Sequence, residues 1–444
     1  MKKSILTITF AMFLLTVIRH GSDGAITRIE YKGLRNTDKS LVTSKLKNKK
    51  DSPFNRDYWL EERDMLMDLD IFADVRYDIR ETDEGKVLVY RFKELPPFIA
   101  FPAMKRTDQD GFLMGPGITH MNMFGLGIHQ ELMARFTMLP EFMRAKELLY
   151  CLNVPDKVLL PVRTELEVNF FDSYNALKLY HEKSVYSNLK FTYSFTGSLS
   201  MVMGISGLWV HHDPDVSVFR ELRRDVDMYA GDGEWDFLPS AGGGFIIDTR
   251  HRVMNPHRGI YSETGISVHG ERLGGDGDFY VLKEDLRIYI PVADKHVLHG
   301  NILARFRPGE IPAYELYHIG GVNSLRTFTP DPDICAQDEV LATAEYRFEL
   351  FTNRQISLFD LHGYYGLQLV LGTDHAFYRE PGDTWSERKY LSSVFAGIHL
   401  LVPALERVRL EFGFNGYDES DRTIRFGINL GWYEKAYTQG RRVR

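Results

Sequence analysis

The chain has 444 residues, 44% of them hydrophobic, and its formal net charge is −7. This composition excludes a membrane protein built from helices, which need stretches of roughly 20 apolar residues, but it leaves open a membrane β-barrel, whose strands alternate apolar and polar residues. The negative charge argues against general nucleic-acid binding, and two cysteines cannot form a disulfide framework.

Residues 1–24 have the pattern of a secretory signal peptide. Lys2 and Lys3 precede an apolar run over residues 5–18, which is too short to span a bilayer comfortably. Small residues in the following segment allow cleavage before Ala25. We therefore expect an exported bacterial protein, with an uncleaved membrane anchor as the alternative.

Residues 25–95 predict a small α+β domain in the order βααββ. The strands show alternation, and the helices show apolar residues at helical spacing. Asp38 is placed to cap the first helix. The expected elements are a strand at 26–31, a helix after Asp38 that includes Leu46, a helix from Pro53 to Leu69, and strands at 75–79 and 87–92.

The order and spacing of these elements resemble a POTRA domain, the periplasmic module associated with polypeptide transport. The resemblance includes "LMDLDIFADV" at 66–75, and it departs from the family pattern at Asp70, where Gly is common. It implies that the domain adds a substrate strand to an exposed edge of its sheet. The sequence leaves open which strand, 26–31, 74–80 or 86–93, forms that edge.

Residues 98–433 predict a transmembrane β-barrel. Within 407–414, charged residues such as Glu411 alternate with apolar ones, and 424–433 alternates in the same way. A soluble β-sandwich also alternates, but export, the aromatic content and the number of strands favour a membrane barrel. Sixteen antiparallel strands are expected, roughly at 98–104, 111–119, 127–138, 142–154, 162–172, 184–196, 198–211, 236–250, 259–271, 279–291, 296–307, 339–351, 361–372, 390–401, 406–415 and 424–433.

An even number of strands places both ends of the barrel domain on one side of the membrane. With a POTRA domain before the first strand, that side is the periplasm, and the longest connection, 308–338, starts on the outside. Residues 434–444 form a C-terminal tail beyond the last strand.

The connection 308–338 contains the motif "GGVNSLRTF" at 320–328. It resembles the "GGxxSLRGF/Y" signature of the outer-membrane protein assembly factor superfamily, which includes BamA and TamA, with Thr327 in place of the usual Gly. The resemblance implies that the loop folds back into the lumen and that 98–104 and 424–433 meet in a seam that opens laterally. The implied loop residues are Gly320, Gly321, Ser324, Leu325, Arg326 and Phe328, and the glycines that weaken the seam strand are Gly427 and Gly431.

An Arg in a barrel lumen needs an acidic partner, because its guanidinium group cannot lose its proton. Glu345 and Glu349 share one face of the strand predicted at 339–351, and Asp374 follows the strand predicted at 361–372. These three carboxylates are the candidate partners of Arg326, in a contact that would pin the loop. The alternative is an Arg on a surface loop.

The sequence has no Walker loop, GxSxG elbow or HExxH motif, so we expect no catalytic residue, no metal site, no cofactor and no enzyme activity. The segment 211–215, which holds two His and two Asp, is more simply an external loop than a metal site. Cys151 and Cys335 could pair if the fold brings them together.

These features favour an outer-membrane β-barrel assembly or insertion factor. Its partners would be unfolded outer-membrane protein clients and outer-membrane lipid, with periplasmic chaperones or accessory lipoproteins, and no nucleic acid. One alternative is a polypeptide secretion pore of the two-partner type, although such transporters usually carry two POTRA domains and a plug helix. Another is a passive outer-membrane channel, which would explain neither the POTRA domain nor the loop motif. A lipid-handling relative cannot be separated by sequence.

Overall fold

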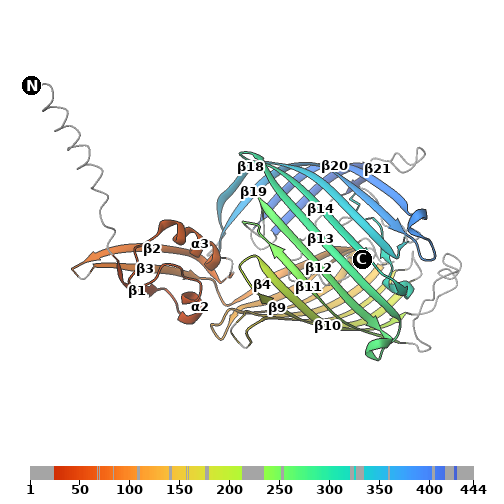
Figure 1. Cartoon of the computed structure of the whole chain (residues 1–444), viewed down its shortest axis with the longest axis horizontal. Coiled ribbons are helices and arrows are strands. Elements are labelled where there is room, and N and C mark those ends of the chain that lie inside the picture. The colour runs from red at the N-terminus through yellow and green to blue at the C-terminus, as the bar shows by residue number, and fades with distance from the viewer. Residues whose placement is uncertain are drawn as a thin grey trace, which may run out of the picture. The chain divides into compact units, whose positions relative to one another are not determined.

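The chain forms two compact units, one comprising residues up to Pro97 with Met121–Gly127, and the other Phe98–His120 with Ile128–Arg444 (Figure 1). The predicted signal peptide and C-terminal tail lie outside the described residues. The computed structural model describes residues 25–67, 69, 71–83, 85–107, 111–139, 143–156, 158, 160–175, 180–212, 235–251, 255–320, 325–326, 335–358, 361–402, 406–415 and 425–427.

The first unit has the predicted order βααββ, with β1 (Ile26–Lys32), α2 (Lys39–Thr43), α3 (Arg56–Met67), β2 (Phe72–Thr82) and β3 (Gly85–Glu94). Asp38 caps α2, accepting a hydrogen bond from the Ser40 amide at 2.7 Å. The sheet order is β1-β3-β2, with β1 parallel and β2 antiparallel to β3. Its core includes Leu41, Trp59, Leu66, Val75 and Tyr90. Within the described residues, no helix has the length and hydropathy needed to cross a membrane.

This sheet order corrects one of the three candidate edges. The strand predicted at 86–93 is β3, which pairs on both sides and therefore lies at the centre of the sheet. The two edge strands are β1 and β2. Sequence periodicity cannot distinguish them from the central strand, because it reports which face a side chain occupies and not which neighbours the backbone has.

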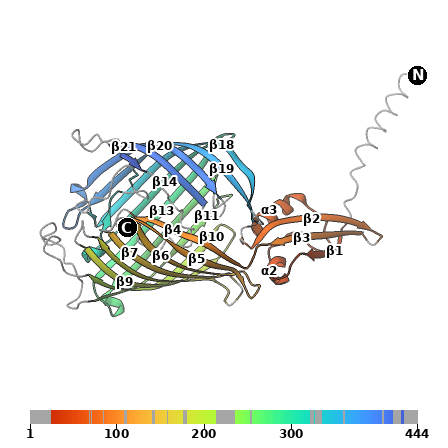
Figure 2. The ribbon, with the colours of Figure 1, turned by 180° about the vertical axis from the view of Figure 1, so that it is seen from behind.

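The second unit is a closed antiparallel β-barrel, which confirms the predicted sixteen-stranded barrel (Figure 2). A two-residue strand, β15 (Gly309–Glu310), joins its wall, and β22 closes on β4. The sixteen main strands are β4 (Phe98–Thr107), β5 (Gly111–Met123), β6 (Ile128–Leu139), β7 (Met143–Val154), β8 (Arg163–Asn175), β9 (Tyr180–Ser194), β10 (Leu199–His212), β11 (Asp236–Asp248), β12 (Gly259–Gly270), β13 (Asp278–Ala293), β14 (His296–Phe306), β18 (Asp338–Leu358), β19 (Leu361–Arg379), β20 (Lys389–Val402), β21 (Glu406–Asn415) and β22 (Arg425–Gly427).

The barrel is polar inside and apolar outside, as the alternation predicts. On β8, Glu165, Glu167 and Asn169 are buried, whereas Phe170 is about half exposed (49%). A soluble barrel of this kind would expose its apolar side chains to water, but in a bilayer the same side chains contact lipid.

The hairpin of β18 and β19 differs from its predicted extent. The two strands were expected at 339–351 and 361–372, whereas β18 continues to Leu358 and β19, which begins at the expected residue, continues to Arg379. Two bulges near Phe351 interrupt the alternation, and backbone pairing continues through a polar sequence that is typical of a turn. The predicted C-terminal ends of both strands were therefore wrong, whereas the predicted start of β19 is correct.

Candidate functional site

The connection between β14 and β18 is anchored to the barrel at its base. Arg307 is fully buried and donates hydrogen bonds to the backbone carbonyls of Gln337 at 2.8 Å and Ala336 at 2.7 Å. Its guanidinium group lies 3.4 Å from the centre of the Tyr317 ring. The connection contains β15, a 3-10 helix, η2 (Ala313–Glu315), and the paired strands β16 (Tyr317–His318) and β17 (Cys335–Ala336).

The next part of the connection carries an apolar anchor and a left-handed glycine. Leu325 is fully buried in a cluster with Ile319 and Leu391. Gly320 has a φ of 123°, a conformation that favours glycine over residues with a side chain. The motif residues Gly321, Ser324 and Phe328 lie outside the described residues. The described part of the motif therefore comprises Gly320, Leu325 and Arg326.

Arg326 contacts carboxylates from three strands of the barrel wall. Its Nη2 lies 3.1 Å from Oε2 of Glu345 on β18, and its Nη1 lies 2.9 Å from Oε1 of Glu411 on β21. Its Nε lies 3.5 Å from Oδ2 of Asp374 on β19, which also accepts the Arg326 amide at 3.2 Å. The side chains of all three acids are at most 3% exposed. We call Arg326, Glu345, Asp374 and Glu411 the loop pin.

The structure separates the predicted partners of Arg326. Glu345 and Asp374 contact it, whereas Glu349 accepts a hydrogen bond from Asn255 at 2.7 Å and pairs with His257 at 2.8 Å. Glu349 was therefore wrongly assigned. It shares the interior face of β18 with Glu345, but it lies four residues, or about 13 Å, further along the strand.

The ring of Phe395 on β20 packs against the guanidinium group, with its ring centre 3.9 Å from the Arg326 Cζ. The ring fits because its neighbour on β19 is Gly372, where an added Cβ would lie 2.4 Å from the Phe395 Cζ. Gly397, on the same strand as Phe395, likewise leaves room for the side chain of Glu411. Two glycines in the wall thus allow the pin to pack closely against the sheet.

Further charges balance the pin. Arg347 donates to Glu345 at 2.5 Å, and the buried His399 Nε2 lies 2.7 Å from Oε1 of Glu411. A buried carboxylate costs several kcal/mol unless it is paired and hydrogen-bonded, so these contacts determine whether the cluster is stable. The arrangement holds a loop in place and presents no nucleophile beside a base.

Sequence reasoning missed Glu411, Phe395 and His399. Glu411 was already identified as one of the charged residues on one face of its strand, so its interior position was predictable. What the alternation does not give is the pairing register, which places Glu411 opposite Gly397 and beside Gly427 of β22. The second seam glycine, Gly431, lies outside the described residues.

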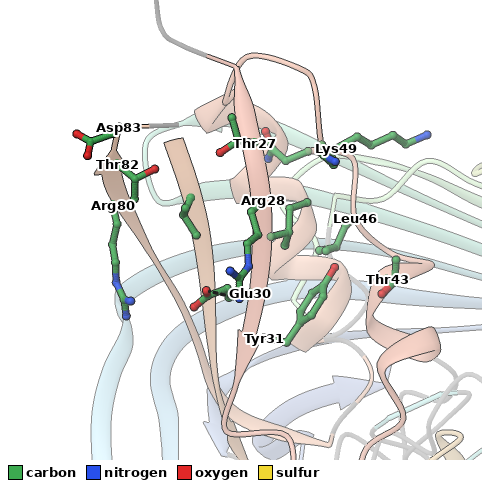
Figure 3. A pocket seen from close by; sticks show the side chains of 14 residues that line it. Thr27, Arg28, Glu30, Tyr31, Thr43, Leu46, Lys49, Arg80, Thr82 and Asp83 are labelled. Carbon is green, nitrogen blue, oxygen red and sulfur yellow. Dashed lines mark ion pairs between the residues drawn. The ribbon is translucent and has the colours of Figure 1, made fainter. Parts of the chain in front are cut away.

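A second candidate site is a groove of about 970 Å³ along β1 of the first unit (Figure 3). Tyr31, Thr43 and Leu46 lie on one side of β1, and Arg28 forms an ion pair with Glu30 at 3.0 Å on the other. The lining also includes Lys49, Lys50 and Arg80.

The start of the β1 edge is already covered by the chain itself. The Ile26 amide donates to Ser52 at 2.9 Å, and the Ile26 carbonyl accepts from Asp51 at 2.7 Å. Residues 27–31 line the groove beyond this cover. The groove therefore runs along a strand edge, where backbone groups can pair with an added strand.

A buried carboxylate holds the wall of this groove. Glu62 on α3 accepts the amides of Lys47 at 2.6 Å and Asn48 at 2.5 Å, and the hydroxyl of Tyr90 at 2.6 Å. The pKa of Tyr90 is raised, mainly by burial and secondly by the hydrogen bond to Glu62. Its hydroxyl therefore stays protonated and donates. These bonds fix the segment that carries Lys49 and Lys50.

Other polar groups considered from the sequence do not converge. No disulfide bond joins Cys151 on β7 to Cys335 in β17. His211 and His212 end β10, and residues 213–215 lie outside the described part of the chain. Among the described residues, no group of three or more His, Cys, Asp or Glu side chains is arranged to hold a metal ion.

Comparison with protein families gives one match that covers most of the chain. The model described as the Omp85 superfamily domain matches residues 123–432. The "Outer membrane protein assembly factor BamA" of Nitratidesulfovibrio vulgaris is 31% identical over 98 residues. That segment is 21% of this chain and 12% of the relative, so the chain matches only a small part of that protein's length.

Two solved structures share the fold at low sequence identity. BamA from Haemophilus ducreyi lacking POTRA domains 1–3 is 16% identical, with a TM-score of 0.58 over 90% of this chain and 83% of that one. CdiB from Escherichia coli is 13% identical, with a TM-score of 0.62 over 89% of this chain and 73% of that one.

Proposed function

Because this chain belongs to the Omp85 superfamily, whose bacterial members are outer-membrane proteins, we propose that it inserts β-barrel proteins into the outer membrane. The observation that carries the proposal is the match of the Omp85 domain to residues 123–432, which reaches from the barrel's second strand to the strand that closes it. In this proposal the seam between β4 and β22 opens and gives unfolded clients a lateral path into lipid.

The first unit acts as a single periplasmic POTRA domain in this proposal. The groove along β1 supports this role, because an unfolded client strand and a free sheet edge offer matching N–H and C=O groups. Backbone pairing depends little on side chains, so one edge can accept clients of different sequence. The process is not enzymatic: burial of client strands in the membrane supplies the free energy.

The main alternative is secretion of a polypeptide through the lumen. Secretion needs a continuous path through the barrel, and the loop pin places Arg326 and three carboxylates inside that path. The contacts of the pin would have to break each time a chain is secreted. The same geometry therefore favours insertion over secretion.

Depletion of the protein, followed by quantitative proteomics of the outer membrane, distinguishes the two functions. An insertion factor should cause many unrelated β-barrel proteins to disappear from the membrane and accumulate unfolded in the periplasm. A secretion pore should affect one or a few secreted proteins. An unchanged outer-membrane proteome would contradict the proposed function.

A further inference from the structure

A charged cluster lies on the N-terminal side of the seam. The side chain of Glu147 on β7 is 1% exposed, and its Oε2 lies 2.9 Å from Nη2 of Arg135, which is its partner in register on β6. Asn169 of β8 donates to Oε1 of Glu147 at 2.7 Å. The two strands next to β7 therefore already supply the counter-charge and a hydrogen bond that a buried carboxylate needs.

A further contact to Glu147 comes from the seam strand β4. Lys105 donates to Oε1 of Glu147 at 3.3 Å, and its Nζ lies 5.7 Å from the ring centre of Phe171 on β8. In the sheet order, β5 and β6 separate β4 from β7, so this side chain reaches past two strands of the wall. By contrast, the Lys283–Glu263 pair, at 3.1 Å, joins the neighbouring strands β13 and β12.

A glycine in β5 shortens the distance that Lys105 has to cover. Gly115 is the partner in register of Ala103 on β4, and a Cβ added to it would collide with the carbonyl oxygen of Ala134 on β6. Without that Cβ, β6 approaches β5 closely, and β7 follows it. The reach from β4 to β7 therefore depends on a position without a side chain.

The backbone of the β4–β5 hairpin lacks a donor on each of its two sides. The Met121 amide donates to the Pro97 carbonyl at 3.0 Å. Because pairs alternate along an antiparallel ladder, the opposed residues Pro102 and Pro116 form a pair whose backbone nitrogens point away from each other. Pro116 therefore offers no N–H to β6, and Pro102 offers none to β22. The hairpin is joined to the rest of the wall by an interrupted ladder.

We propose that Lys105 is a positioning residue that ties the β4–β5 hairpin to β7 through Glu147 and keeps β4 in the wall when the seam opens. We call this contact the β4 strut. It bypasses the interrupted ladder between β5 and β6 and ends on a strand that is paired on both sides. The contact is independent of what the protein does, whereas its role at the seam rests on the proposed function.

Hydrogen exchange of the purified full-length protein in lipid nanodiscs tests the strut. Lys105→Met removes the ammonium group and leaves Glu147 paired with Arg135, so the barrel should still fold. Amides in peptides that cover 98–107 should exchange about fivefold faster, because a partly exposed ion pair is lost, and those of β18–β21 should not change.

Two further variants separate the strut from a general loss of charge. Lys105→Arg should restore slow exchange in β4, because a guanidinium group can also donate to Glu147. Lys283→Met removes a similar pair elsewhere in the lumen and should leave exchange in β4 unchanged. If exchange in β4 does not change in Lys105→Met, or rises equally in every strand, the strut is refuted.

Client assembly in cells provides a separate measurement for the role at the seam. Cells with Lys105→Met should assemble fewer outer-membrane proteins than cells with Lys283→Met. Equal assembly, together with faster exchange in β4, would overturn the role of the strut in insertion. Because the exchange experiment contains no client, its result stands or falls independently of the proposed function.

Discussion

Arg326 contributes one planar group of five N–H donors that faces three buried carboxylates. The donors diverge in the plane of the guanidinium group, so Glu345, Asp374 and Glu411 can be contacted from three separate strands at once. A lysine ammonium is a compact point charge and cannot reproduce this fork. The residue type is therefore explained by the geometry of its partners.

Arg326→Ala should lower the heat stability of the barrel, because it leaves three buried carboxylates without their central cation. Breaking a buried ion pair costs about 3–5 kcal/mol, and Arg326→Lys should recover only part of this. The measurement is the temperature at which the folded barrel loses its altered mobility in detergent gels. Glu345→Ala, Asp374→Ala and Glu411→Ala should resemble Arg326→Ala, and an unchanged transition in Arg326→Ala would contradict the pin.

Gly372→Ala should weaken the same pin without changing any charge. Its added Cβ would lie 2.4 Å from the Phe395 ring and 2.6 Å from the Ala344 carbonyl oxygen, so the ring must move from beneath Arg326. Such overpacking costs about 1–3 kcal/mol. In the Arg326→Ala background the effect of Gly372→Ala on heat stability should shrink, and full additivity would show that Phe395 does not support Arg326.

At this scale the sequence predicted the charged groups better than their pairing. Glu345 and Asp374 follow from strand alternation together with the resemblance of the loop motif. Glu349 and Glu411 occupy interior positions that alternation also predicts, but their partners depend on loops that return from 90 or so residues away in the chain. The contact between Phe395 and Arg326 could not be predicted from the sequence. It depends on Gly372, which lies opposite Phe395 on the neighbouring strand and has no side chain.

At the scale of elements, strand positions were predictable wherever a turn sequence ends a strand. The predicted strand 406–415 has the bounds of β21, and most others differ by a few residues. The β18–β19 hairpin is the exception, because the part next to its turn is defined by backbone pairing between the two strands and not by alternation. In the first unit the element order was predictable, whereas the choice of edge strand depends on a parallel pairing between its first and last strands.

Proline substitutions in the first unit test the groove along β1. A series over residues 27–31 should include a variant whose barrel inserts normally while clients accumulate in the periplasm, because proline removes an outward N–H needed by an added strand. The matched control is Val89→Pro in the central β3, which should unfold the unit, as detected by proteolysis. If every tolerated β1 variant supports normal client assembly, the β1 edge is not the docking site.

Glu62→Ala should open the wall of the same groove. The change removes the acceptor of the Lys47 and Asn48 amides and of the Tyr90 hydroxyl, all in a buried setting. A buried donor left unsatisfied costs about 1–3 kcal/mol, so protease cleavage within 45–50 of the full-length protein should become faster. Glu62→Gln keeps one acceptor oxygen, so its cleavage rate should lie between those of the unchanged protein and Glu62→Ala. Equal cleavage rates in these three proteins would contradict this account.

At the scale of the whole barrel, every described contact of the loop pin lies on one side of the seam. Glu345, Asp374, Phe395 and Glu411 belong to the four consecutive strands β18–β21, and β21 pairs with β22 at the closing edge. Opening between β22 and β4 would therefore leave the loop attached to the C-terminal side. The pin lies on the strands that precede the closing edge, and it need not break for the seam to open.

Locking the seam should stop the function while leaving the pin intact. Gly427 pairs with Glu411, whose side chain is buried inside the barrel. The test therefore combines a cysteine at Gly427 with a cysteine at Phe101, Ala103 or Lys105 of β4, one position at a time, in a background without Cys151 and Cys335.

Of these β4 positions, the one in register with Gly427 should form a disulfide in the membrane, since bridging requires Cα atoms within about 7 Å. The oxidised protein should keep the heat stability of the barrel, because no pin residue has changed, but client insertion should fall to the level of depleted cells and recover after reduction. The Gly427→Cys single variant, treated with the same oxidant, controls for weakening of the strand itself. Full client insertion by the locked barrel would show that clients reach the bilayer without lateral opening.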